Sequence, residues 1–236
     1  MDVSPLPPPP VHPVRPPRVV LPQEEHFLLQ TSDGQSLEAL GRLPSEARRA
    51  VVLCHPHPLH GGTMHNAIVV ALAKTLAEAG GQEVGTLRFN FRGVEASTGR
   101  YADGEGEKLD VIGAVDALRN MMPNVPVTVV GYSFGSWVGL RAAWEQEEVE
   151  RVALIAPAAR IFRYAEQDGE CRRPLPTEIL VGDRDEFVSV ASARNLARYL
   201  GAQLHVLDGA DHFFVGQRRL VAKMLLPFVA PDIDSP

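Results

Sequence analysis

The chain has 236 residues, of which 45% are apolar and 22% are charged, and its formal net charge is -6. This length and composition are typical of one soluble domain with a buried core, and the negative balance argues against a protein that neutralises nucleic-acid phosphates. No apolar run approaches the roughly 18 to 20 residues that a membrane-spanning helix needs.

Residues 1–22 contain nine prolines and lack the charged start and apolar middle of a secretory signal. Such a segment favours an extended polyproline conformation. We interpret it as a Pro-rich tail, either a disordered leader or a strap laid over a single domain at residues 23–236; a ligand for a proline-recognising module is a further alternative. Two cysteines, Cys54 and Cys171, do not make a disulfide framework, so we expect a protein of the reducing cytoplasm.

From residue 25 onward, apolar β-rich runs alternate with helical patterns. The predicted strands lie at residues 25–30, 36–42, 50–55, 84–91, 127–132, 151–156, 177–182 and 203–208. The predicted helices lie at residues 66–79, 106–121, 134–146, 189–200 and 215–229. This rhythm predicts an α/β fold: a mostly parallel sheet of about seven to eight strands with helices on both faces and the first two strands as an antiparallel edge. The short connection between the sixth and seventh strands leaves no room for a large lid, so we expect a site open to solvent.

The segment VTVVGYSFGS at residues 127–136 holds Ser133 between two glycines, where a strand turns directly into a helix. A junction of this kind strains the serine and thrusts its side chain outward, and Gly131 and Gly135 remove side chains that would collide there. Ser133 is therefore a candidate nucleophile.

A serine nucleophile needs a base that is itself oriented by an acid. In an open parallel sheet these partners follow later strands at their carboxyl ends. His212 lies just after the last predicted strand and fits the base. For the acid, Asp183 and Asp185 both follow the seventh strand, with Glu186 a weaker candidate.

An oxyanion hole needs backbone N–H groups aimed at the developing charge. Phe134 follows the candidate nucleophile and opens a helix, so its N–H is one expected donor. The second is expected from the loop after the third strand, where Pro56 and Pro58 have no N–H and His57 lies between them.

The chain resembles the α/β-hydrolase superfamily, and within it the small lidless bacterial serine hydrolases with a His-Pro-His-Pro loop that runs into Gly-Gly-Thr-Met. The resemblance covers roughly residues 25–230 and is carried by the segments HPHPLHGGTMHN, RFNFRGVEASTG, GYSFGS and GDRDEFV followed by DHFF. The family's acid usually stands in a Gly-x-x-Asp-x-x-Val pattern, which implies Asp185 and not Asp183. One departure is Glu95, where the family more often carries glycine, and it leaves the local loop geometry open.

Arg92 has two interpretations, a structural role in bracing loops beneath the site or contact with substrate. The fixed fork of an arginine suits holding carbonyls and carboxylates, which favours the structural role.

Two other functions compete. His55, His57, His60 and His65 lie within eleven residues, and the H-x-H-x-x-H pattern of the first three resembles the zinc-binding loop of metallo-β-lactamase-like hydrolases. That loop normally has an aspartate where this chain has Leu59. A non-catalytic hydrolase-like binding protein is the other alternative, and such proteins typically lack one of the three catalytic residue types. We therefore predict a carboxylesterase-like serine hydrolase that acts on a small acyl ester through Ser133, His212 and Asp185, with no cofactor.

Overall fold

The computed structural model describes residues 18–159, 161–162, 164 and 174–231. Most of the predicted Pro-rich tail, and Cys171, lie outside these residues. Residues 18–22 are described, and the Val19 N–H donates to His65 Nδ1 across 3.0 Å. This part of the predicted tail therefore lies against the body of the protein.

The centre of the fold is an eight-stranded sheet in the order β1-β2-β4-β3-β5-β6-β7-β8. The strands are β1 Glu25–Gln30, β2 Ser36–Arg42, β3 Arg49–Cys54, β4 Val84–Phe89, β5 Val127–Tyr132, β6 Val149–Ile155, β7 Thr177–Gly182 and β8 Gln203–Leu207. β2 pairs antiparallel with both β1 and β4, and every other pairing is parallel. The predicted mostly parallel sheet with an antiparallel edge is confirmed.

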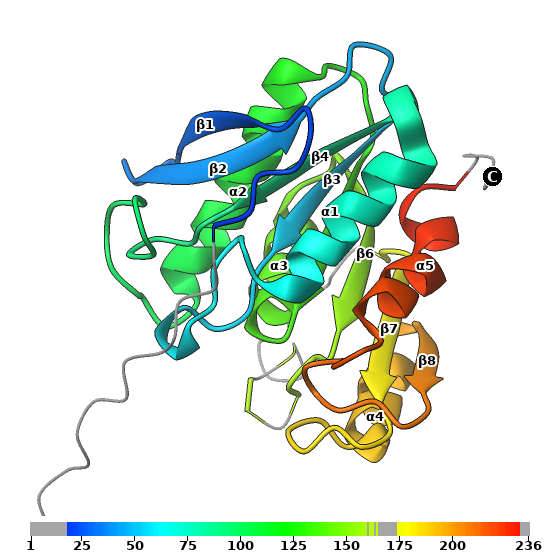
Figure 1. Cartoon of the computed structure of the whole chain (residues 1–236). Coiled ribbons are helices and arrows are strands. Elements are labelled where there is room, and N and C mark those ends of the chain that lie inside the picture. Colours follow the sequence, from blue (N-terminus) through cyan, green and yellow to red (C-terminus); the bar gives the residue numbers. More distant parts are fainter. Residues whose placement is uncertain (1–17, 160, 163, 165–173, 232–236) are drawn as a thin grey trace, which may run out of the picture.

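Helices cover both faces of this sheet (Figure 1). They are α1 Ala67–Gly80, α2 Glu105–Met121, α3 Phe134–Glu145, α4 Val190–Leu200 and α5 Arg218–Val229. α1 packs against α5 over one face, and α2 packs against α3 over the other. The β7-α4-β8 crossover runs across the sheet in the same direction as β5-α3-β6, so right-handed connections place α4 on the face of α3. No helix among the described residues is long and apolar enough to cross a membrane.

The central strands are apolar on both sides because helices cover both sides. Every residue of β4 and β5 is buried. Val129 and Val130 are consecutive and point to opposite faces, yet both are buried. Cys54, at the end of β3, is also buried, and burial raises the pKa of its thiol.

Most elements differ from the prediction by one to three residues at an end, and two of these differences have a clear structural cause. α5 begins at Arg218 and not at residue 215, because Phe214 and Gly216 have φ angles of 49° and 76°, which a right-handed helix cannot accommodate. β4 ends at Phe89 and not at residue 91, because its partner β3 ends at Cys54. The Phe91 N–H instead donates to His55 Nε2 across 3.0 Å.

A buried ion pair ties residues 19–24 to the sheet. Arg88 of β4 donates from Nε to Glu24 Oε1 across 2.7 Å, and the side chains of both residues are at most 1% exposed. The Arg88 guanidinium also donates to the carbonyls of Val19 and Met64. One buried cation therefore holds the chain just before β1 and the loop before α1.

We expect Glu24→Ala to lower the free energy of unfolding by about 3 kcal/mol or more, because it leaves the Arg88 charge buried without a carboxylate. Urea denaturation measures the change. Glu25→Ala is the matched control, since Glu25 is exposed, and we expect an effect within about 0.5 kcal/mol. Equal effects of the two substitutions would show that the buried pair contributes little.

Candidate active site

Ser133 stands at the turn between β5 and α3. Its φ of 54° and ψ of -112° form a combination that residues other than glycine rarely adopt. The Ser133 N–H donates to the carbonyl of Ile155, 2.8 Å away at the end of β6. The neighbouring strand therefore helps to hold this strained turn at the carboxyl edge of the parallel strands.

Gly131 and Gly135 allow backbone segments to approach one another around the turn. A Cβ atom on Gly131 would overlap the carbonyl of Gly135, and one on Gly135 would lie 2.5 Å from the carbonyl oxygen of Cys54. No side chain fits at such separations, so β5, α3 and the end of β3 can meet only through glycine. The predicted reason for the two glycines is confirmed.

Ser136 belongs to the same turn and was missed by sequence reasoning. Its hydroxyl is buried and lies 2.7 Å from the carbonyl oxygen of Gly131 and 3.1 Å from that of Ile155. These contacts join the first turn of α3 to both strands. The available signal was a hydroxyl residue on an otherwise apolar helix face, three residues after Ser133.

The structure brings Ser133, His212 and Asp185 together. His212 Nε2 lies 3.2 Å from Ser133 Oγ, and His212 Nδ1 lies 2.8 Å from Asp185 Oδ2. The Asp185 carboxylate is fully buried and also accepts the N–H groups of Phe187 and Val188 through Oδ1. Asp183 and Glu186, the other candidate acids, are exposed, and Asp185 makes the hydrogen bond to His212.

This arrangement fixes the tautomer of His212. An ionised carboxylate can only accept, so Nδ1 carries the proton and Nε2 presents a lone pair to the Ser133 hydroxyl. Tyr132 also fixes the loop, since its hydroxyl donates to the His212 carbonyl across 3.0 Å. Sequence reasoning treated Tyr132 only as the last strand residue, because its partner lies 80 residues away.

The loop after β3 places His57 beside the turn. The His57 ring packs against the rings of Phe134 and Tyr101, with centroids 4.9 Å and 5.0 Å away, and its Nδ1 accepts the Leu59 N–H. Burial lowers the pKa of the His57 imidazole to about 4, with a further contribution from His60, so the ring is neutral at pH 7. The backbone N–H groups of His57 and Phe134 donate a hydrogen bond to no group within the described part of the chain.

The histidine-rich loop does not fit a metal centre. Both nitrogens of His55 are used within the protein, because Nδ1 donates to the Pro56 carbonyl and Nε2 accepts the Phe91 N–H. Burial lowers the pKa of His55 to about 3. The described residues contain no group of three histidine, cysteine or acidic side chains that could hold a metal ion. His55 and His57 instead bond to backbone groups of this loop and of the segment after β4.

A cavity of about 490 Å³ opens beside Ser133. Its wall includes His57, Phe162, Phe187 and Phe213. Phe187 and Phe213 are about half exposed. The cavity therefore joins the serine, the histidine and the His57 loop in one mainly apolar depression.

Known proteins share the fold of this chain. The family model described as serine hydrolase matches residues 111–218. An uncharacterized protein of Rickettsia prowazekii (strain Madrid E) is 34% identical over 173 residues, which are 70% of this chain and 71% of that protein. The structure of an α/β serine hydrolase homologue from Coxiella burnetii is 33% identical, with a TM-score of 0.76 over 87% of this chain and 97% of its own. This chain belongs to the α/β serine hydrolases.

A second solved structure shows the same architecture. It is described as an α/β serine hydrolase without lid from Xanthomonas campestris, and it is 27% identical, with a TM-score of 0.78 over 93% of this chain and 100% of its own. In the described part of residues 156–176, between β6 and β7, the present serine hydrolase has neither helix nor strand. The predicted fold without a large lid is confirmed.

Arg92 of this serine hydrolase braces loops, as its guanidinium geometry predicted. Its Nε and Nη2 donate to Asp110 Oδ1 across 2.9 Å and 2.7 Å, and its Nη1 donates to Asp33 Oδ2 across 2.8 Å. The Arg92 side chain is only 6% exposed. All of these partners belong to the protein, and Arg92 does not line the cavity beside Ser133.

Glu95 adopts the backbone conformation that glycine would adopt at this departure from the family pattern. Its φ is 48°. Its buried carboxylate accepts from Asn90 Nδ2 across 3.3 Å and lies 3.8 Å from His65 Nε2. Polar contacts of the Glu95 side chain thus accompany its positive φ.

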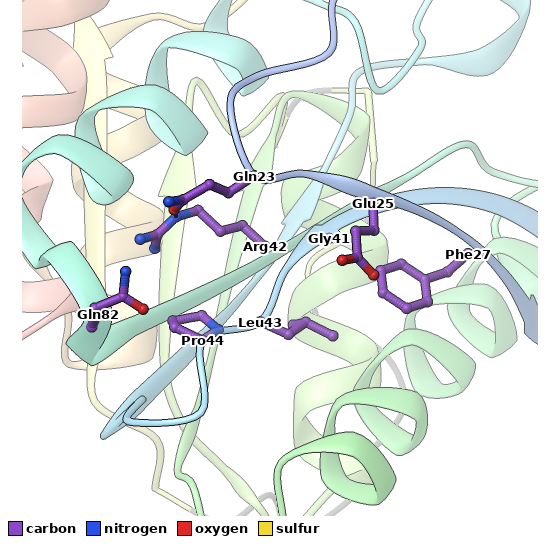
Figure 2. Close-up of a pocket in the computed structure, with 8 residues that line it drawn as sticks. All are labelled: Gln23, Glu25, Phe27, Gly41, Arg42, Leu43, Pro44 and Gln82. Carbon is purple, nitrogen blue, oxygen red and sulfur yellow. Dashed lines mark hydrogen bonds between the residues drawn. The ribbon is translucent and has the colours of Figure 1, made fainter.

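A second cavity, of about 210 Å³, lies at the far end of the strands (Figure 2). Its wall includes Gln82, two residues before the start of β4, and Arg42, the last residue of β2. The Arg42 guanidinium is already bonded to Gln23 Oε1 and to the Val84 carbonyl. This cavity therefore lies near the amino end of β4, whereas Ser133 lies at the carboxyl end of β5.

We expect Gly135→Ala to abolish or strongly reduce soluble, folded protein, because the added methyl group would be forced against the carbonyls of Cys54 and His55. Expression yield and thermal unfolding measure this. Gly139→Ala in the same helix is the control, since its Cβ would meet a Val129 methyl group at 3.1 Å, which can shift, and Cys54 Sγ at an ordinary contact distance of 3.8 Å. A normal melting temperature for Gly135→Ala would contradict the steric explanation of the turn.

Proposed function

We propose that this protein is a carboxylesterase-like serine hydrolase that cleaves small acyl esters through an acyl-enzyme intermediate. The carrying observation is the hydrogen-bonded series from Asp185 through His212 to Ser133 beside the cavity. The buried carboxylate orients the imidazole, and the imidazole presents its free lone pair to the serine hydroxyl. This is the arrangement that a weak hydroxyl nucleophile needs.

In the proposed reaction, Ser133 Oγ attacks the ester carbonyl while His212 Nε2 takes the hydroxyl proton. Asp185 stabilises the imidazolium that forms. When the tetrahedral intermediate collapses, the bond to the alcohol oxygen breaks, and His212 gives its proton to that oxygen. A water molecule then repeats these steps on the acyl-enzyme, with His212 as base, and releases the carboxylic acid and free Ser133.

The proposed oxyanion hole consists of the backbone N–H groups of His57 and Phe134. Two features support this assignment: neither N–H donates elsewhere among the described residues, and Phe134 begins α3, where the helix dipole favours negative charge. The neutral His57 ring packs into an aromatic group, so we assign the role to its backbone. All groups needed for ester hydrolysis then come from the chain itself, and the proposal includes no cofactor.

We expect Ser133→Ala, His212→Ala and Asp185→Asn each to lower kcat for 4-nitrophenyl acetate by about three orders of magnitude or more, because the three residues act as one unit. A fluorophosphonate probe should label the native protein and not Ser133→Ala. Asp183→Asn is the matched control, since Asp183 is an exposed residue of the same loop. If Asp183→Asn were the damaging change and Asp185→Asn were harmless, the proposed acid would be wrong.

We expect kcat of His57→Pro to be about 10²- to 10³-fold lower than kcat of His57→Ala, which is the effect of removing one oxyanion-hole donor. Both substitutions remove the imidazole, but only proline removes the N–H. The native φ of -51° is close to the range that proline adopts, so the comparison isolates the donor. Steady-state kinetics measure the ratio, and circular dichroism verifies folding. Equal activity of the two variants would contradict a donor role for His57.

A further inference from the structure

Two phenylalanine side chains flank the histidine of the candidate active site. The ring centroids of Phe187 and Phe213 lie 4.9 Å and 5.5 Å from that of His212, with interplanar angles of 68° and 89°. The two phenyl rings are 6.3 Å apart and nearly perpendicular to each other. They therefore form a corner beside His212, and both line the cavity.

This corner is exposed but anchored. Phe187 is 46% exposed and Phe213 is 50% exposed, so each ring keeps a free apolar surface. Their backbones are held, since the Phe187 N–H donates to Asp185 Oδ1 across 2.9 Å, and Phe213 directly follows His212 and accepts through its carbonyl from Arg218 Nε, at the start of α5, across 3.2 Å. The rings are therefore held close to the catalytic groups by contacts that do not involve the rings themselves.

A different aromatic group surrounds the proposed oxyanion donors. Phe162 stacks on Trp137 with centroids 4.9 Å apart, and it also contacts the rings of Phe134 and His57. This second group lies beside the position of the ester carbonyl oxygen. The cavity wall next to His212 is thus formed by Phe187 and Phe213, and the wall next to the proposed oxyanion donors includes Phe162.

The proposed reaction decides which part of the ester meets each group. His212 must protonate the leaving oxygen, so that oxygen comes within hydrogen-bond reach of Nε2 during acylation. The remainder of the alcohol then lies next to the side chains that flank His212. The acyl group stays attached to Ser133, with its oxygen directed to His57 and Phe134.

We propose that Phe187 and Phe213 form an alcohol subsite that selects esters of apolar, ring-bearing alcohols. This inference rests on the proposed function. Two perpendicular phenyl rings allow a third ring to stack on one and to meet the other edge to face, which are the arrangements that aromatic pairs prefer. The methoxy group of a methyl ester is too small to make these contacts with both rings.

The test compares benzyl acetate with methyl acetate in the native protein and in Phe187→Ala and Phe213→Ala. Each substitution should lower kcat/KM for benzyl acetate roughly ten-fold, in line with the apolar area lost, and change that for methyl acetate less than about two-fold. Leu220→Ala is the control, because Leu220 of α5 is equally exposed at 46% but does not line the cavity. It should leave the ratio of the two esters unchanged.

Deacylation provides the second measurement. Both acetates form the same acetyl-enzyme, from which the alcohol has already left. The slow phase after a burst with 4-nitrophenyl acetate should therefore be the same in the native protein and in both phenylalanine variants. Because deacylation also uses His212, an unchanged slow phase shows that the histidine is still correctly placed.

Two results would overturn the alcohol subsite while the proposed function stands. One is an equal loss of kcat/KM for both acetates, and the other is slower deacylation in the variants, which would assign the rings to the acyl side or to the support of His212. A native protein with no burst and no fluorophosphonate labelling would overturn the proposed function itself, and the subsite with it.

Discussion

The close approach of backbone segments at Gly131 and Gly135 is the constraint on which the candidate site depends. The contact between Gly135 and the carbonyl of Cys54 brings the start of α3 against the end of β3. The loop that carries His57 leaves β3 at this point, and Phe134 begins α3 beside it. The close approach beside the strained Ser133 therefore also places the two proposed oxyanion donors together.

The partners of Ser133 reach it because two neighbouring strands end in register. Gly182 at the end of β7 pairs with Leu207 at the end of β8, and the Asp183 N–H donates to the Leu207 carbonyl. The two following loops pack so closely that a Cβ atom on Gly182 would overlap the carbonyl of Ala210. Backbone contacts between the two loops thus help to position Asp185 and His212, in addition to the hydrogen bond between their side chains.

Buried polar groups hold the surrounding loops in place. His55 links the His57 loop to the backbone after β4, and Arg92 links that same backbone to α2 through Asp110. Arg88 performs a similar task for residues 19–24. Buried polar groups are costly unless they are hydrogen-bonded, and buried charges are costly unless they are paired, so each of these side chains fixes the geometry of its partners. Loops beside the site gain definition from contacts that take no part in the proposed chemistry.

By itself, the sequence determined the alternation of strands and helices, the glycine-flanked turn at Ser133 and the order in which Ser, Asp and His follow their strands. Burial and backbone freedom act over a few residues, so local patterns report them. The residues alone left Asp183 and Asp185 open as the acid, the family resemblance implied Asp185, and the tertiary structure brings Asp185 to His212. Only the tertiary structure decided that α5 begins late, that Arg88 pairs with Glu24, and that Phe187 and Phe213 form a corner. These outcomes depend on the direction of side chains and on contacts between residues far apart in the sequence, which packing alone sets.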